Sequence, residues 1–437
     1  MLELWFDFSC PYAYLASHRA KQLAEPVDWR PMLLGGVFRG IGAGDGPMAT
    51  ISPSKQMHNV HDMVRWADHF GVPFRLPPQH PMRTVLALRT LLALPHDVWP
   101  QAIEAIFAAY WQRGENVATP EVIAAALADA GLAGDVVSAA LARSDDAAIK
   151  DELRQRTDEA IGLGIFGAPA WVMRDGRADG ATRLIWGQDR MAWVEAMQAG
   201  WQLAGPPAGG PRPFAPSAPA IAGKTLDVYF DVASPFAYLG LTQLPALAAG
   251  VRTRLVPILL GALFRDLGQA NVPWFAMPPP KQRHVGLDMQ RFASWWGVPF
   301  ELPRKFPQRT IAAQRLCVVA AAEGFETGVR LAAALGRAMW GEQRDLEDDD
   351  TLRAILEAEG LPAAWLDRTQ DPAIKAELAA NTTAARAAGV FGVPTFVVDG
   401  THLFWGQDRL ELVAKTLAGW TPPTPPSFGS YGERWNK

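Results

Sequence analysis

The sequence is poor in cysteine, in long apolar runs and in excess charge. Its only cysteines are Cys10 and Cys317, which excludes a CxxC pair, a zinc ribbon and a disulfide framework and favours a reducing cytoplasm. No stretch reaches 18 uninterrupted apolar residues, so a transmembrane helix is not expected. The opening MLELWFDFSC lacks the basic region of a signal peptide. A net charge of −4 lacks the basic excess of a nucleic-acid-binding surface.

What the chain does have is the composition and length of an ordinary globular protein. Hydrophobic residues make up 49% and charged residues 20% of its 437 positions. Such a balance is typical of chains that bury a core, and the length predicts two to four domains.

An internal repeat is the most informative feature of the sequence. FDFSCPYAYL, which begins at Phe6, returns as FDVASPFAYL at Phe230. Four more blocks recur in the same order: RPMLLGGVFR as VPILLGALFR, PSK as PPK, GIFGAPAWVM as GVFGVPTFVV, and WGQDR unchanged. The offsets run from 219 (Trp186 to Trp405) to 226 (Arg30 to Val256). The chain is therefore predicted to contain two tandem copies of one domain.

The repeat also predicts the domain boundaries. We assign the first copy to residues 1–203 and the second to residues 224–420. Residues 204–223 between them are rich in Pro, Gly and Ala and carry one charge, as a semi-extended linker does. A Pro-rich tail covers residues 421–437.

Each copy is predicted to form, in order, a strand, a helix, a strand, a long helical middle, a strand pair and a final helix. The apolar runs LELWFDF and LDVYFDV have strand length, and a proline follows Cys10 and Ser234 where a helix would begin. The middle regions, about 50–160 and 276–385, have helical spacing. This order predicts a thioredoxin-like α/β layout with a helical insertion in each copy.

Together these motifs resemble the glutathione-dependent branch of the DsbA-like thioredoxin superfamily. They are most similar to the 2-hydroxychromene-2-carboxylate isomerase family, with the kappa-class glutathione transferases as relatives. The family pattern is an FDxxSPYxYL opening, a P-x-K helix start, a GVFGVP turn and a WGxDR ending, and this sequence shows it twice. The resemblance implies two DsbA-like domains and glutathione as the cofactor.

Ser234 is the main catalytic candidate, because it precedes the proline at the start of a helix. The positive end of a helix dipole and its unpaired N–H groups favour an anion there. In the family a serine at this position donates a hydrogen bond to the sulfur of bound glutathione. The alternative for Ser234 is a plain helix N-cap.

The first copy departs from this pattern at two positions. Cys10 stands where the second copy has Ser234, and no second cysteine follows to resolve a disulfide. Cys10 could act as a monothiol redox group, as a substitute hydrogen-bond donor, or only as a small buried residue. The family's loop asparagine matches Asn271, whereas the first copy has Asp45, whose charge would oppose a bound carboxylate or thiolate.

The resemblance assigns glutathione contacts to further residues of both copies. The lysines would reach a carboxylate of glutathione or of the substrate, the residue pairs ending in an expected cis-proline would offer backbone groups, and the aspartates would take the γ-glutamyl ammonium. Ordinary surface lysines and helix N-caps are the alternatives. These residues are Lys55, Ala168, Pro169 and Asp189 in the first copy and Lys281, Val393, Pro394 and Asp408 in the second.

A polar stripe recurs on one helix face without a role implied by the family. A solvated face or salt bridges between helices is the usual explanation, and a cleft that binds an acidic substrate is the alternative. Metal binding is not expected, because the spacing is not that of a ligand cluster. The stripe consists of Lys55, His58, Asp62 and Arg65, repeated as Lys281, His284, Asp288 and Arg291.

The sequence thus predicts a cytoplasmic, glutathione-dependent isomerase for an aromatic-catabolite carboxylate. Nucleic acid and membrane are not expected as partners, and the tandem could act as a monomeric pseudo-dimer. Three alternatives stay open: a monothiol DsbA-like oxidoreductase, a glutathione transferase, and a non-catalytic scaffold that holds glutathione or a peptide.

Overall fold

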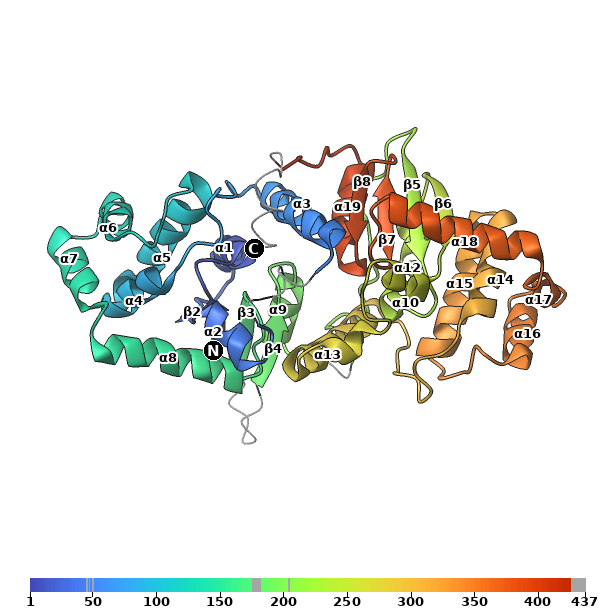
Figure 1. The fold of residues 1–437 in the computed structure, drawn as a ribbon, viewed down its shortest axis with the longest axis horizontal. Coiled ribbons are helices and arrows are strands. Elements are labelled where there is room, and N and C mark those ends of the chain that lie inside the picture. The colour runs from blue at the N-terminus through green and yellow to red at the C-terminus, as the bar shows by residue number, and fades with distance from the viewer. Residues whose placement is uncertain (45, 47, 49–50, 175–181, 203–204, 426–437) are drawn as a thin grey trace.

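The computed structural model describes residues 1–44, 46, 48, 51–174, 182–202 and 205–425 (Figure 1). Asp45, to which the sequence assigns an opposing charge, therefore lies outside the described residues, as does most of the predicted tail. Two sheets with the same topology form along the chain, one in each copy. In the described residues no helix combines the length and the apolar character needed to cross a bilayer.

Each copy builds a four-stranded mixed sheet in which the second strand lies at one edge and the fourth at the other. In both sheets the first strand pairs parallel with the second and antiparallel with the third, and the third and fourth form an antiparallel pair. The strands of the first copy are β1 (Leu2–Phe6), β2 (Asp28–Pro31), β3 (Ala170–Arg174) and β4 (Thr182–Trp186). Those of the second are β5 (Thr225–Phe230), β6 (Arg252–Pro257), β7 (Thr395–Val398) and β8 (His402–Trp405).

Helices connect the strands and fill the long middle of each copy, which confirms the predicted α/β fold with a helical insertion. Proline occupies the first turn of the helix after the first strand in each copy, where its missing N–H is not needed. The first copy has α1 (Pro11–Ala20), α2 (Leu34–Gly40), α3 (Pro53–His69), α4 (Val85–Ala93), α5 (Trp99–Ala108), α6 (Pro120–Asp129), α7 (Gly134–Arg143), α8 (Ala147–Gly162) and α9 (Met191–Gln198). The second has α10 (Pro235–Leu241), α11 (Leu244–Leu247), α12 (Leu260–Asp266), α13 (Pro279–Trp296), α14 (Ile311–Ala322), α15 (Phe325–Trp340), α16 (Asp349–Ala358), α17 (Trp365–Arg368), α18 (Pro372–Ala387) and α19 (Leu410–Leu417).

A buried tryptophan from the helical insertion holds the loop after the first strand in both copies. The indole of Trp111 donates to the carbonyl of Phe8 at 2.8 Å, and that of Trp340 donates to the carbonyl of Val232 at 2.9 Å. Both tryptophans are fully buried. The insertion thereby fixes the backbone two residues ahead of Cys10 and Ser234.

The helices α3 and α13 each lie against the other copy, in a reciprocal arrangement (Figure 1). From α3, Arg65 donates to the carbonyl of Leu403 in β8 at 2.5 Å. From α13, Arg291 donates to the carbonyl of Leu184 in β4 at 2.8 Å. The predicted polar stripe therefore lies between the copies rather than on a solvated face.

The segment between the copies contains no helix or strand over residues 205–223 and follows the surface of the second copy. The N–H of Arg212 donates to the carbonyl of Trp295 at 2.5 Å, and the N–H of Phe214 donates to the side chain of Gln243 at 2.8 Å. Further along, the N–H of Ile221 donates to the carbonyl of Leu417 at 3.0 Å. These bonds anchor the segment to α13, to the loop before α11 and to α19.

Candidate functional site

Ser234 lies at the N-cap of α10 with its hydroxyl buried beside the turn that precedes β7. Its Oγ accepts the N–H of Ala237 at 3.2 Å and donates to the carbonyl of Val393 at 3.3 Å. The side chain is 5% exposed. Ser234 is therefore an N-cap and also the donor that connects the start of α10 to the Val393–Pro394 turn.

Both predicted cis-prolines are present. The Ala168–Pro169 and Val393–Pro394 bonds are cis. The carbonyl of Ala168 accepts from Cys10, and the carbonyl of Val393 accepts from Ser234 in the same way. Two further cis bonds, before Pro81 and Pro307, were not predicted from the sequence.

Cys10 occupies the same place in the first copy, but its environment does not favour a thiolate. Its S–H donates to the carbonyl of Ala168 at 3.1 Å, and the side chain is 6% exposed. Burial raises the pKa of this thiol to about 12, although the N–H groups of Ala13 and Tyr12 act in the opposite direction. The thiol is thus protonated at neutral pH, contrary to the lowered pKa that a monothiol redox group needs.

In each copy a buried aspartate holds the loop that follows the first strand, and the sequence did not identify this aspartate as a site residue. Asp7 accepts the N–H of Ser9 at 2.9 Å, the N–H of Leu34 at 2.8 Å and the hydroxyl of Thr84 at 2.6 Å. Its counterpart Asp231 makes the equivalent bonds in the second copy, to Ala233, Leu260 and Thr310. Burial raises the pKa of Asp231 to about 6. The repeated FD pair was the only signal that could have shown it.

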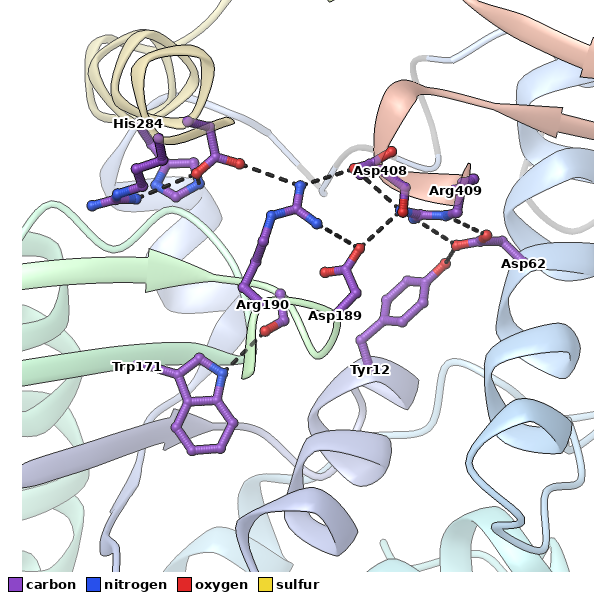
Figure 2. Close-up of polar contacts among 11 residues, drawn as sticks. Tyr12, Asp62, Trp171, Asp189, Arg190, His284, Asp408 and Arg409 are labelled. Atoms are coloured by element: carbon purple, nitrogen blue, oxygen red, sulfur yellow. Dashed lines mark hydrogen bonds and ion pairs between the residues drawn. The ribbon is translucent and has the colours of Figure 1, made fainter. Parts of the chain in front are cut away.

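The aspartates of the two GQDR motifs belong to one cluster of ion pairs between the copies (Figure 2). Arg190 reaches its own Asp189 at 2.7 Å and Asp408 of the other copy at 2.9 Å. Arg409 reaches Asp189 at 2.8 Å and Asp408 at 3.1 Å. Asp189 and Asp408 therefore share both arginines, and neither caps the last helix of its copy, whose N-caps are Arg190 and Arg409.

The polar stripe supplies the outer members of this cluster. Asp62 of α3 receives two bonds from Arg409, at 2.7 and 2.9 Å, and a third from the hydroxyl of Tyr12 at 3.0 Å. Asp288 of α13 lies 3.3 Å from Arg190 and 3.3 Å from Arg291. Four carboxylates thus meet three guanidinium groups, and the arginines keep the pKa values of Asp62 and Asp408 low despite burial. For Asp189, burial outweighs the arginines and raises the pKa.

The two predicted lysines lie at the start of the same helices. Lys55 of α3 places its Nζ 4.5 Å from the centre of the Trp405 ring, which belongs to the second copy. Burial, reinforced by repulsion from Lys281, lowers the pKa of Lys55 to about 8. Burial also lowers the pKa of Lys281. Each lysine is half-buried, and the described residues offer neither of them a carboxylate partner.

Asn271, the loop residue that the resemblance assigns to glutathione, is exposed near the start of α12. Its side-chain oxygen lies so close to Gly261 that a Cβ there would come within 2.8 Å of it. The structure therefore brings Ser234, Val393 and Pro394 together, places Asn271 on the surface beside α12, and directs Lys55 to the opposite copy.

The comparisons with known proteins agree with this duplicated architecture. The chain matches the DSBA-like thioredoxin domain family twice, over residues 1–197 and over residues 225–418. These two matches confirm the predicted tandem duplication.

Curated relatives each correspond to one copy. The 2-hydroxychromene-2-carboxylate isomerase of Sphingobium xenophagum is 32% identical over 203 residues, which make up 44% of this chain and 98% of the relative. Glutathione S-transferase kappa 1 of Rattus norvegicus is 28% identical over 224 residues, or 48% of this chain and 98% of the relative. Among solved structures, a 2-hydroxychromene-2-carboxylate isomerase is similar with a TM-score of 0.40 and 25% identity, over 44% of this chain and 94% of its own.

Proposed function

Because the chain belongs to the DSBA-like thioredoxin domain family, we propose that it is a glutathione-dependent isomerase of the 2-hydroxychromene-2-carboxylate type. The observation that carries this proposal is the Ser234 hydroxyl, held at the N-cap of α10 and 3.3 Å from the carbonyl of Val393. The relatives named isomerase and glutathione transferase support the same chemistry. An aromatic-catabolite carboxylate is the proposed substrate, and the cytoplasm the proposed compartment.

The residues around Ser234 fit glutathione. The N-terminus of α10 favours an anionic sulfur, and the hydroxyl of Ser234 can donate to it in place of the carbonyl of Val393. The backbone beside the cis-proline Pro394 can pair with an extended peptide. Asp408, which pairs with Arg190 and Arg409, would also take the γ-glutamyl ammonium of glutathione, as the resemblance implies.

When bound, glutathione would supply a thiolate that adds reversibly to a conjugated double bond of the ring-opened substrate and so permits rotation about that bond. The protein's contribution is electrostatic. Ser234 and the first N–H groups of α10 would hold the sulfur in its anionic form, while a cation such as Lys281, which the resemblance assigns to this site, would stabilise the negative charge that develops on the substrate. The proposed isomerisation changes no oxidation state, so the residues of this chain would need to supply neither electrons nor a net proton.

A glutathione transferase is the second candidate, since the kappa-class transferase of Rattus norvegicus is 28% identical over 224 residues. It would use the same activated sulfur and differ only in keeping the sulfur attached to the product. The environment of Cys10 disfavours the monothiol oxidoreductase, because burial raises the pKa of this thiol rather than lowering it. We propose that the first copy is not the catalytic one.

The quaternary structure follows from the reciprocal packing of α3 and α13. Each helix already contacts the sheet of the other copy, as subunits of a symmetric dimer would. We propose that a single chain is sufficient, without a nucleic-acid or membrane partner. Sedimentation equilibrium should then give the mass of one chain, and an obligate dimer would contradict the pseudo-dimer.

Turnover of 2-hydroxychromene-2-carboxylate in the presence of glutathione tests the function. Ser234→Ala should lower kcat by about 100-fold, the usual effect of removing one donor to a reactive anion. Cys10→Ala, the matched change in the first copy, should have a far smaller effect. Circular dichroism would verify that both variants fold. If Ser234→Ala leaves turnover unchanged, Ser234 has no part in the reaction.

A further inference from the structure

We propose that Gln314 of α14 is a positioning residue for Ser234, because its side chain holds the loop from which the serine projects. This inference rests on the proposed function and extends it to a residue that acts through the backbone. The repeated motifs do not single out Gln314, since the first copy has Leu88 at the corresponding place.

The side chain of Gln314 makes two hydrogen bonds to the loop between β5 and α10. Its Nε2 donates to the carbonyl of Phe230 at 2.8 Å, and its Oε1 accepts the N–H of Val232 at 3.2 Å. These partners fix the orientation of the amide, because one is an acceptor and the other a donor. Gln314 is fully buried, so both bonds form away from water and are costly to lose.

The two bonds act directly before the serine. Val232 lies two residues ahead of Ser234, and its carbonyl accepts the indole N–H of Trp340. The N–H of Ala233 donates to the side chain of Asp231 at 2.9 Å. The N–H of Ser234 donates to the carbonyl of Asp231 at 3.0 Å. The peptide groups that lead into the serine are therefore fixed one after another, and the glutamine amide holds the first of them.

The matching helix of the first copy has no amide at this place. Thr84 and Thr310 are the N-caps of α4 and α14, and the hydroxyl of each donates to the buried aspartate of its copy. Four residues after these threonines stand Leu88 and Gln314. A leucine side chain has neither a donor nor an acceptor, so α4 cannot hold the loop as α14 does.

The first copy supports its loop by a different side chain. The hydroxyl of Ser9 donates to the carboxylate of Asp7 at 3.0 Å, whereas the second copy has Ala233 at the position of Ser9. The tryptophan bond and the buried aspartate occur in both copies. Of these supports, the glutamine amide is the one that the second copy does not share with the first.

A fixed loop matters because the serine has to aim a single donor. In the proposed reaction the hydroxyl of Ser234 turns from the carbonyl of Val393 to the sulfur of glutathione. Hydrogen bonds weaken steeply when their angle departs from linear. A displacement of about 1 Å at a reacting group can cost about 100-fold in rate. Without the amide of Gln314, the serine and the start of α10 would hold the thiolate less well.

Gln314→Leu tests this role, because it gives the second copy the residue of the first. The buried Leu88 shows that the fold accepts a leucine at this place. Gln243→Leu is the matched control. Gln243 is also a buried amide of the second copy, but it accepts the N–H of Phe214 in the segment between the copies, at 2.8 Å. Circular dichroism and urea denaturation would establish that both variants fold and how much stability each loses.

Two quantities are then measured: turnover of 2-hydroxychromene-2-carboxylate with glutathione, and the pKa of the bound glutathione thiol from the ultraviolet absorbance of its thiolate. Gln314→Leu should lower kcat about tenfold. It should also raise the pKa of the bound thiol by about one pH unit, which corresponds to a tenfold weaker preference for the anion. Gln243→Leu should leave kcat and the thiol pKa close to those of the wild type.

Unchanged kcat and thiol pKa in Gln314→Leu would overturn the inference. Equal losses of kcat in the two variants would do the same, as would a loss of kcat in Gln314→Leu without a rise in the thiol pKa, because both indicate general destabilisation. These results would leave the proposed function intact. Wild-type protein that neither binds glutathione nor turns over the substrate would overturn both.

Discussion

The two copies share a fold but differ at the point where chemistry is expected. Each has the parallel first pair of strands, the buried aspartate, the supporting tryptophan and the cis-proline turn. At the start of the first helix, however, Ser234 caps α10 through its hydroxyl, whereas Cys10 makes no cap and stays protonated. The comparison teaches that the supporting structure has been kept twice, while the hydroxyl donor has been kept only in the second copy.

The first copy nevertheless contributes to the structure around the second. Its helix α3 carries Lys55 and His58 to the turn beside Ser234, and its Asp62 fixes Arg409 of the second copy. The copy that lacks the serine thus still packs beside the turn to which the Ser234 hydroxyl donates. The predictions below address how closely the two copies depend on each other.

The largest effect is expected from breaking the cluster of ion pairs between the copies. Arg409→Met would leave Asp62 without its guanidinium partner and would leave Asp189 and Asp408 with Arg190 alone. Removing one partner of a buried pair costs about 3–5 kcal/mol. Urea denaturation should show this loss of unfolding free energy. The control is Arg254→Met, which removes an exposed pair with Asp227 and should cost less than about 1 kcal/mol.

A second prediction concerns pH and the two buried histidines. Burial lowers the pKa of His58 to about 3 and that of His284 to about 4. Between these values and about 6.5 the unfolded chain takes up protons that the folded chain does not, so stability falls as the pH falls. At pH 5 each histidine should account for about 2 kcal/mol of this loss.

His58→Gln keeps an acceptor for the N–H of Trp405 but cannot titrate. Denaturation at pH 7 and pH 5 should therefore show a smaller difference for His58→Gln than for wild type, and His284→Gln should behave likewise. An unchanged difference in both variants would mean that the histidines are not held neutral between the copies.

A smaller effect is expected from making the first copy resemble the second at Tyr12, whose counterpart is Phe236. Tyr12→Phe removes the hydroxyl bond to Asp62, but Asp62 keeps both bonds from Arg409. The expected cost is about 1 kcal/mol of unfolding free energy. A double-mutant cycle with Asp62→Asn measures the coupling directly, and zero coupling would show that this hydrogen bond is not formed in solution.

Much of the fold was predictable from the sequence because its signals are local. The repeated blocks, the strand-length apolar runs, the Ser234–Pro235 helix start and the cis-prolines all depend on neighbouring residues. The surface that the polar stripe contacts was not predictable from local signals. Helical spacing places Lys55, His58 and Asp62 on one face, but it does not say which surface that face meets, and here it is the other copy.

Local sequence signals were also insufficient to predict how the residues of the candidate site are paired. The resemblance assigned Asp189 and Asp408 to separate sites, yet the packing of the copies joins them through Arg190 and Arg409. It also left the role of Cys10 open, because the buried thiol donates to the carbonyl of Ala168, a residue 158 positions away in the sequence. Such effects arise from contacts that are distant in the sequence.

Titration calorimetry of glutathione into wild type, Cys10→Ala and Ser234→Ala tests the central claim, that only the second copy is a working site. The account predicts one binding site per chain, kept in Cys10→Ala and lost or strongly weakened in Ser234→Ala. Two sites per chain in the wild type, or a site that disappears with Cys10→Ala, would contradict it.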